Sequence, residues 1–221
     1  MPNEFAKVIF VRDVFKQWYL EGINSKIDSI ESLVEFLKQE TQGLKITCVG
    51  SSAGGYAATL FGTLLEATRI FNFSGQFSLW HSLKEEEKRK SNPILLKNES
   101  NSEVNQYFDI VNLVKARNLP IFYFYPGKCT KDIQQSQLVK NIANIYDFKF
   151  DDATHGCTVL AVSLRDLFGL SSSELIDLHQ KNRNKMINPL SFSVQVSGIK
   201  KTGGYFISKT CKTLRKKIKR M

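Results

Sequence analysis

The sequence of 221 residues predicts an α/β domain with a mostly parallel, doubly wound sheet. Two observations lead to this fold class. Short apolar runs rich in β-branched and aromatic residues alternate with segments of helical periodicity through most of the chain. The first 73 residues supply the order β-α-β-α-β, and parallel strands joined in this way need helices on both faces of the sheet.

Three strands and two helices are expected before residue 74. The strands are apolar runs typical of a buried parallel sheet, at residues 7–11, 46–49 and 69–73. A helix is expected over residues 30–39, where apolar residues recur at i, i+3, i+4 and i+7 after the N-cap types Asp28 and Ser29. The second helix follows residue 52 and ends near Leu65.

Residues 75–119 interrupt this alternation and are expected to form a cap insertion. The segment contains a charge run at residues 84–90, a polar stretch at 91–103 and a helix predicted over 104–116. An insertion of this length between two strands is either a cap over a site or a decorated crossover. The sequence leaves both alternatives open.

Strands and helices alternate again after the insertion. The expected order is a strand at 120–125, a turn at 126–132, a helix at 133–144, a strand near a sheet edge at 145–150 and a helix at 159–168. These elements complete an α/β domain that we expect to occupy residues 1–180.

Residues 181–221 are expected to form a linker and a basic tail. Nine positive charges and no acidic residue follow residue 199, so subtracting them from the net charge of +10 leaves +1 for the rest of the chain. A near-neutral domain argues against a nucleic-acid partner. Residues 190–196 alternate like an edge or docking strand, and residues 210–221 predict a basic helix. The tail is either a solvated end or a weak attachment to an anionic membrane or an acidic protein partner.

The sequence pattern gives no targeting or cofactor signal. Residues 1–7 lack the apolar core of a signal peptide, and no apolar run reaches the ~18 residues of a membrane span. The four cysteines, Cys48, Cys129, Cys157 and Cys211, have no metal-binding spacing and are expected to be reduced thiols. We therefore expect a cytoplasmic protein, peripheral at the inner face of the membrane if the tail binds lipid, with no metal or other cofactor.

The central motif is Gly50-Ser-Ser-Ala-Gly54, which reads G-x-S-x-G with Ser52 in the middle. It follows a short apolar strand and precedes a helix of small residues, which is the setting of a nucleophile elbow. Such a turn holds the serine in a strained conformation above the sheet. Glycine is expected at both Gly50 and Gly54, because a Cβ there would collide with the neighbouring chain.

Asp132 and His155 complete the pattern of a catalytic triad. Like Ser52, each follows the end of a predicted strand, so all three are expected at one rim of the sheet. Ser52 would be the nucleophile, His155 the base, and Asp132 the group that orients the histidine. The backbone N–H of Ala53, at the start of a helix, would bind the oxyanion.

Other polar residues compete for these roles. His81 is a substrate contact or a surface residue, and His179 is expected to be solvated at a helix end. Asp151 and Asp152 are close to His155 in sequence but are expected to be turn or cap residues.

The chain resembles the α/β-hydrolase superfamily, and in particular the compact serine-hydrolase-like proteins of bacterial surface-polysaccharide gene clusters. The resemblance covers roughly residues 7–170 and rests on Arg12-Asp13, Trp18-Tyr19, Gly50-Ser-Ser-Ala-Gly-Gly-Tyr-Ala-Ala58, Phe73-Ser-Gly-Gln76 and His155 before an apolar helix. It implies action on acyl esters, including O-acetyl groups on sugars.

The candidate substrate-binding residues belong to these same motifs: Arg12, Asp13, Trp18, Tyr19 and Gln76. Arg12 and Asp13 either line the site or form a structural pair at a strand end. Trp18 and Tyr19 either stack on a sugar ring or pack in the core.

The sequence departs from the family in its shortened N-terminal part. A full α/β-hydrolase has several strands before the nucleophile strand, and only residues 7–11 are available here. In the family that region gives the second oxyanion donor, and the N–H of Asp13 or Val14 is the candidate in this chain. Losing one such donor costs on the order of 10²–10³ in rate.

Three functions remain open on the sequence. The first is a serine hydrolase, a carboxylesterase or deacetylase whose substrate is a small acyl ester or an acylated sugar. The second is an acyltransferase that uses the same triad to acylate a sugar hydroxyl. The third is a non-catalytic, hydrolase-like binding component of a polysaccharide machine.

Overall fold

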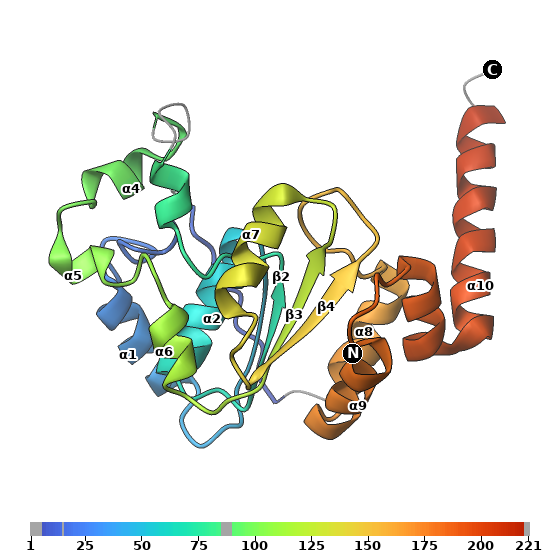
Figure 1. Cartoon of the computed structure of the whole chain (residues 1–221), viewed down its shortest axis with the longest axis horizontal. Coiled ribbons are helices and arrows are strands. Elements are labelled where there is room, and N and C mark those ends of the chain that lie inside the picture. The colour runs from blue at the N-terminus through green and yellow to red at the C-terminus, as the bar shows by residue number, and fades with distance from the viewer. Residues whose placement is uncertain (1–5, 15, 85–89, 219–221) are drawn as a thin grey trace.

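A computed structural model describes residues 6–14, 16–84 and 90–218 (Figure 1). Its centre is a four-stranded sheet of β1 (Thr47–Ser51), β2 (Arg69–Phe73), β3 (Ile121–Pro126) and β4 (Ile145–Phe150). The strands lie in the order β1-β2-β3-β4, and every neighbouring pair is parallel. The predicted α/β class with a parallel sheet is confirmed, and β4 lies at an edge as expected.

Helices cover both faces of the sheet. On one face, α2 (Ala53–Leu64), α6 (Val111–Lys115) and α7 (Thr130–Val139) pack against residues such as Ile70, Ile121 and Tyr123. On the other face, α8 (Ala161–Gly169), α9 (Ser172–Asn182) and the first part of α10 (Pro189–Ile218) pack against phenylalanines of β2, β3 and β4. Because the strands follow one another in the sheet in chain order, the helices that connect them lie on one face. The helices after β4 therefore cover the other face.

The first helix forms where the sequence predicts it. α1 spans Ile30–Glu40 and begins at Ser29, whose hydroxyl accepts the N–H of Ser32 at 3.0 Å. The Ser32 hydroxyl in turn accepts the N–H of Ser29, also at 3.0 Å, so two N–H groups at the helix start are satisfied. Leu33 and Leu37 face the core beside α2.

The prediction of a buried strand over residues 7–11 is wrong. This segment is irregular and forms no pairing with the described strands, and Val8 and Phe10 are 58% and 93% exposed. Only alternate residues, Ile9 and Val11, pack against the core. A cavity of about 410 Å³ lies between the segment, β1 and α2, so the segment does not reach the open edge of β1.

The insertion contains short helical turns instead of the single helix predicted over 104–116, which is a second correction. Its described elements include η1 (Trp80–Leu83), α4 (Pro93–Lys97), α5 (Ser102–Asn105) and α6. Residues 108–110 pair with the chain after β2, because Leu79 N–H donates to the Phe108 carbonyl and Ile110 N–H donates to that of Phe77. Leu95 and Phe108 are buried beside α1 and α2. Most of the charge run, residues 85–89, lies outside the described residues.

The C-terminal region corrects the predicted linker and strand. Residues 190–196 are helical, in the first part of α10, and Phe192 is fully buried against β3 and β4. Ile187 pairs with Phe150, so packing against the sheet continues past residue 180.

α10 breaks at Gly198 (φ 78°), and its second part projects away from the body (Figure 1). The predicted basic helix is present as far as Ile218, beyond which it lies outside the described residues. Among the helices described, none is both long and apolar enough to cross a membrane.

Candidate active site

Ser52 sits in a sharp turn between β1 and α2. Its backbone adopts φ 55° and ψ −123°, which a residue with a side chain rarely does. The turn is held by two hydrogen bonds, since Ser52 N–H donates to the Phe73 carbonyl at 2.9 Å and Gly55 N–H donates to the Ser52 carbonyl at 2.8 Å. The sequence motif therefore forms the strained elbow that it predicts.

The two motif glycines differ in their steric role. A Cβ on Gly50 would lie 1.9 Å from the Gly54 carbonyl oxygen, so the expected collision exists there. A Cβ on Gly54 would have no atom within 4 Å, so the same expectation is wrong for Gly54. The second close approach is instead between Gly55 and Gly75, where a Cβ on Gly55 would lie 2.7 Å from the Gly75 Cα.

A buried network of polar side chains holds Gly55 and Gly75 close together. The Asn72 side chain accepts the N–H of Gly75 at 2.6 Å and donates to the Thr59 hydroxyl at 2.8 Å. The Thr59 hydroxyl donates to the Gly55 carbonyl at 2.9 Å. Because Asn72 and Thr59 are fully buried, this network joins β2, α2 and the chain after β2 into one rigid unit beneath the elbow.

Asp132 lies in the first turn of α7. The sequence places it at the end of a turn over 126–132, but the helix begins earlier, at Thr130. Its carboxylate is 2% exposed and close to the N-terminal end of the helix, where the aligned peptide dipoles favour a negative charge. The helix therefore presents Asp132 in a fixed position.

His155 lies in the loop after β4, which several hydrogen bonds hold. The Ser74 hydroxyl donates to the Gly156 carbonyl at 2.7 Å, and Lys128 N–H donates to the Asp152 carbonyl at 2.9 Å. Asp152 also accepts the N–H of Thr154 at 2.8 Å, which is the turn role that the sequence predicts for it. The loop is thus tied to the ends of both β2 and β3.

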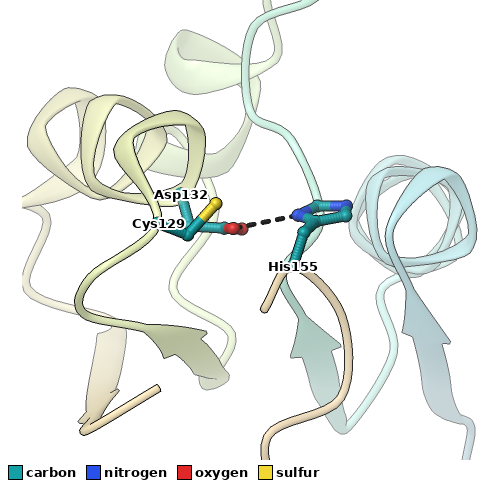
Figure 2. A group of neighbouring side chains, drawn as sticks. All are labelled: Cys129, Asp132 and His155. Carbon is teal, nitrogen blue, oxygen red and sulfur yellow. Dashed lines mark hydrogen bonds and ion pairs between the residues drawn. The ribbon is translucent and has the colours of Figure 1, made fainter. Parts of the chain in front are cut away.

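These three elements bring the predicted triad residues together. Ser52 Oγ lies 2.8 Å from His155 Nε2, and His155 Nδ1 lies 2.9 Å from Asp132 Oδ2. With the proton of the neutral imidazole on Nδ1, the histidine donates to the carboxylate and can accept the proton of the serine. Figure 2 shows this Asp132–His155 contact, with Asp132 on the left and His155 opposite it. The arrangement has the geometry that nucleophilic catalysis requires.

The two candidate oxyanion donors, the backbone N–H groups of Ala53 and Val14, lie in different surroundings. Ala53 is the first residue of α2, so its N–H belongs to the unsatisfied donors at the helix start beside Ser52. Val14 is 55% exposed in the irregular N-terminal segment. Among the described residues, no hydrogen bond joins Val14, Arg12 or Gln76 to the triad residues.

The other substrate-binding candidates make structural contacts. Asp13 Oδ2 accepts the N–H groups of Gln17 at 2.6 Å and Tyr19 at 3.2 Å, so it shapes its own loop. Trp18 packs edge-on against Tyr56, with ring centroids 6.0 Å apart, and Tyr19 does the same against Phe61 at 6.3 Å. Burial raises the pKa of Tyr19.

His179, at a helix end, is expected to be solvated, but its side chain is mostly buried. His179 packs edge-on against the rings of Tyr146 and Phe148, and its side chain is 13% exposed. Its Nε2 lies 3.6 Å from Asp147 Oδ1, and this contact lowers the pKa of Asp147. His179 therefore has a structural partner on β4, far in sequence from the elbow.

Three further residues beside the triad hold its loops or lie in contact range of it. Ser74 and Asn72 anchor the loops described above, and the sequence signals for Ser74 are its place just after a strand end and its membership of the Phe73–Gln76 motif. Cys129 precedes α7 and has its sulfur near both Asp132 and His155 (Figure 2). Burial and the neighbouring Asp132 carboxylate raise the pKa of the Cys129 thiol.

Comparisons of the sequence and of the structure with known proteins give different results. No protein-family model matches the sequence, and no curated protein matches it. Among solved structures, the chain is similar to the acylaminoacyl peptidase of Pyrococcus horikoshii, with a TM-score of 0.42 and 15% identity. The match covers 62% of this chain and 23% of the peptidase chain. Fold and site geometry, rather than the activity of a relative, therefore support the function proposed below.

Proposed function

We propose that this protein is a serine hydrolase of the α/β-hydrolase type that cleaves acyl esters through Ser52, His155 and Asp132. The observation that carries the proposal is the continuous chain of contacts from Ser52 Oγ to His155 at 2.8 Å and from His155 to Asp132 at 2.9 Å. The strained Ser52 backbone supports it further, because strain of this kind is retained where a site requires it.

The reaction has two steps. Ser52 Oγ attacks the acyl carbon while His155 Nε2 takes its proton, and the Ala53 N–H stabilises the negative oxygen that develops. His155 then gives the proton to the departing alcohol, leaving an acyl-enzyme. Water attacks that intermediate, with His155 again as the base, and releases the acid and free Ser52. Asp132 stabilises the imidazolium in both steps.

Hydrolysis is favoured over acyl transfer by the openness of the site. The His155 side chain is 34% exposed, and the insertion packs beside α1 and α2, so water can reach the base. An acyltransferase has to exclude water from its acyl-enzyme, because hydrolysis competes with transfer. A carboxylesterase or a deacetylase acting on a small ester or an acylated sugar is therefore the preferred form of the proposal.

Labelling with a fluorophosphonate tests the proposal directly. The wild-type protein should form one covalent adduct, detected by intact mass, and Ser52→Ala should form none. Ser51→Ala is the matched control, because Ser51 is the exposed neighbour of the nucleophile and its loss should leave labelling unchanged. No adduct on wild type, or an adduct that survives Ser52→Ala, would refute the triad and favour a non-catalytic binding protein.

We also propose that the second part of α10 attaches the enzyme weakly to an anionic lipid surface. This part carries the basic residues of the tail and extends from the body, and Ile199 and Ile207 are 76% and 68% exposed. Exposed apolar residues among positive charges suit a helix lying at a lipid interface. In vesicle sedimentation, the full chain should bind anionic vesicles less as salt is raised, and a chain ending at residue 199 should not bind. Equal binding of both chains would show that the tail does not attach the protein to the lipid surface.

A further inference from the structure

Cys129, Asp132 and His155 form a cluster of three metal-ligating side chains. The Cys129 Sγ, one Asp132 carboxylate oxygen and one His155 ring nitrogen all lie within 4.8 Å of one another. Figure 2 shows the sulfur beside the carboxylate, on the side that the imidazole faces. The proposed hydrolysis uses Asp132 and His155 but gives Cys129 no step.

Two of the three side chains have a common rigid support. Cys129 is the N-cap residue of α7 and Asp132 is in its first turn. The Cys129 carbonyl accepts the N–H of Ile133 at 3.0 Å, and its own N–H donates to the Pro126 carbonyl at 3.3 Å. Their spacing is therefore set by the helix start, and only His155 comes from a different element.

The dimensions of the cluster suit a tetrahedral ion. Zinc lies about 2.3 Å from a thiolate and about 2.0–2.2 Å from nitrogen and oxygen ligands, which places neighbouring ligand atoms roughly 3.4 Å apart. The His155 Nδ1 and Asp132 Oδ2 are 2.9 Å apart and the Cys129 Sγ lies within 4.8 Å of both residues' ligand atoms, so side-chain shifts of about 1 Å or less would bring all three to these spacings. A water molecule would supply the fourth ligand, as in zinc sites with three protein ligands.

We propose that Cys129, Asp132 and His155 bind Zn²⁺, and that bound zinc switches off the triad. This inference rests on the proposed function, because the switch acts on His155. Zinc takes the lone pair of Nδ1, so the proton of the neutral imidazole moves to Nε2, which faces Ser52 Oγ at 2.8 Å. A protonated Nε2 cannot accept the serine proton. The Cys129 thiol loses its proton to solvent, so one proton is released for each ion bound.

The three ligand types also predict which metal ions inhibit the enzyme. A thiolate and an imidazole favour zinc and similar borderline or soft ions, whereas Mg²⁺ and Ca²⁺ prefer oxygen ligands. Zinc should therefore inhibit at concentrations at which magnesium and calcium have no effect.

The test separates metal binding from catalysis. Binding is measured on the full chain by competition with a chromophoric zinc chelator, and with Co²⁺ as a probe whose absorption reports a thiolate ligand. The wild type and Ser52→Ala should bind one ion with equal affinity, because Ser52 is not a ligand. Cys129→Ser should bind at least about tenfold more weakly, since even changes around metal ligands cost 10–100-fold. Cys157→Ser is the matched control, because Cys157 is an exposed thiol two residues after His155 and outside the cluster.

Ester hydrolysis then tests the switch. Zinc should inhibit the wild type and Cys157→Ser, a chelator should restore the rate, and Cys129→Ser should resist inhibition relative to its own zinc-free rate. Equal zinc affinity in the wild type and Cys129→Ser, or equal inhibition of both, would overturn the inference. A different result would refute the proposed function alone: the protein would still bind zinc through Cys129 but would form no fluorophosphonate adduct.

Discussion

Ser74 ties the end of β2 to the loop that carries His155, because its hydroxyl donates a 2.7 Å hydrogen bond to the Gly156 carbonyl. Ser74 is 1% exposed and has a left-handed backbone (φ 53°), and its N–H donates to the Phe124 carbonyl at 2.8 Å. The serine is therefore fixed to the sheet while its side chain holds the residue next to the proposed base. Ser74 is a positioning residue in this arrangement.

Removing that hydroxyl should slow catalysis without weakening substrate binding. We expect Ser74→Ala to lower kcat by roughly 10- to 100-fold with little change in KM, since small displacements of a catalytic group have effects of this size. The rate of fluorophosphonate labelling should fall in parallel.

The matched control is Ser193→Ala, in the first part of α10, which covers one face of the sheet. It removes another buried serine hydrogen bond of 2.7 Å, from the Ser163 hydroxyl to that of Ser193. The expected cost is about 1 kcal/mol of unfolding free energy with kcat unchanged. An equal loss of kcat in both variants would show that Ser74 acts through general stability alone.

Asp132→Asn should reduce kcat by on the order of 10⁴-fold, as the same change does in a serine protease triad. An amide cannot stabilise the imidazolium and favours the wrong tautomer of His155. The measurement is steady-state hydrolysis of an activated ester. Asp147→Asn is the control, because Asp147 is also close to a histidine, His179, but is not part of the triad. Comparable losses in the two variants would contradict the assignment of Asp132.

The Asp147–His179 contact should instead stabilise the fold in a pH-dependent way. His179 lowers the folded-state pKa of Asp147, so the contribution is complete above the unfolded-state pKa of about 3.9 and is lost as pH falls through the lower folded value. Urea unfolding of wild type and Asp147→Asn should differ at neutral pH. The difference should shrink below about pH 4 as the carboxylate is protonated. A difference that stays constant from pH 7 to pH 3 would exclude this linkage.

The sequence predicted the sheet well because its signals are local. β2 and β4 have the predicted bounds, and α1 follows a capping residue that acts as expected. The sequence signal of the elbow is also local, since Gly50 meets Gly54 within the turn, although the hydrogen bond from Ser52 N–H to the Phe73 carbonyl is a long-range contact. Asp132 and His155 could be chosen from their places after strand ends, because parallel strands bring those ends to one rim.

The errors arise where long-range packing decides the structure. Residues 7–11 have a strand-like composition, but a cavity separates them from β1 and they remain irregular. Residues 190–196 alternate in polarity, yet they form a helix because Phe192 is buried among the phenylalanines of the sheet. The approach of Cys129 to His155 depends on where α7 begins relative to the loop after β4, and the sequence does not specify that distance.

The two glycines of the elbow provide the last prediction, because their structural roles are opposite. Gly50→Ala would place a Cβ 1.9 Å from the Gly54 carbonyl oxygen, and neither backbone can shift without distorting the turn at Ser52. We expect a loss of about 3 kcal/mol of unfolding free energy or more, at or above the upper end of ordinary overpacking, together with lost fluorophosphonate labelling. Gly54→Ala meets open space and lies in α2, so its stability should be unchanged or rise by up to about 1 kcal/mol. Chemical denaturation of the two variants measures both effects, and a Gly50→Ala protein as stable as Gly54→Ala would mean that the turn at Ser52 is not held as tightly as these contacts require.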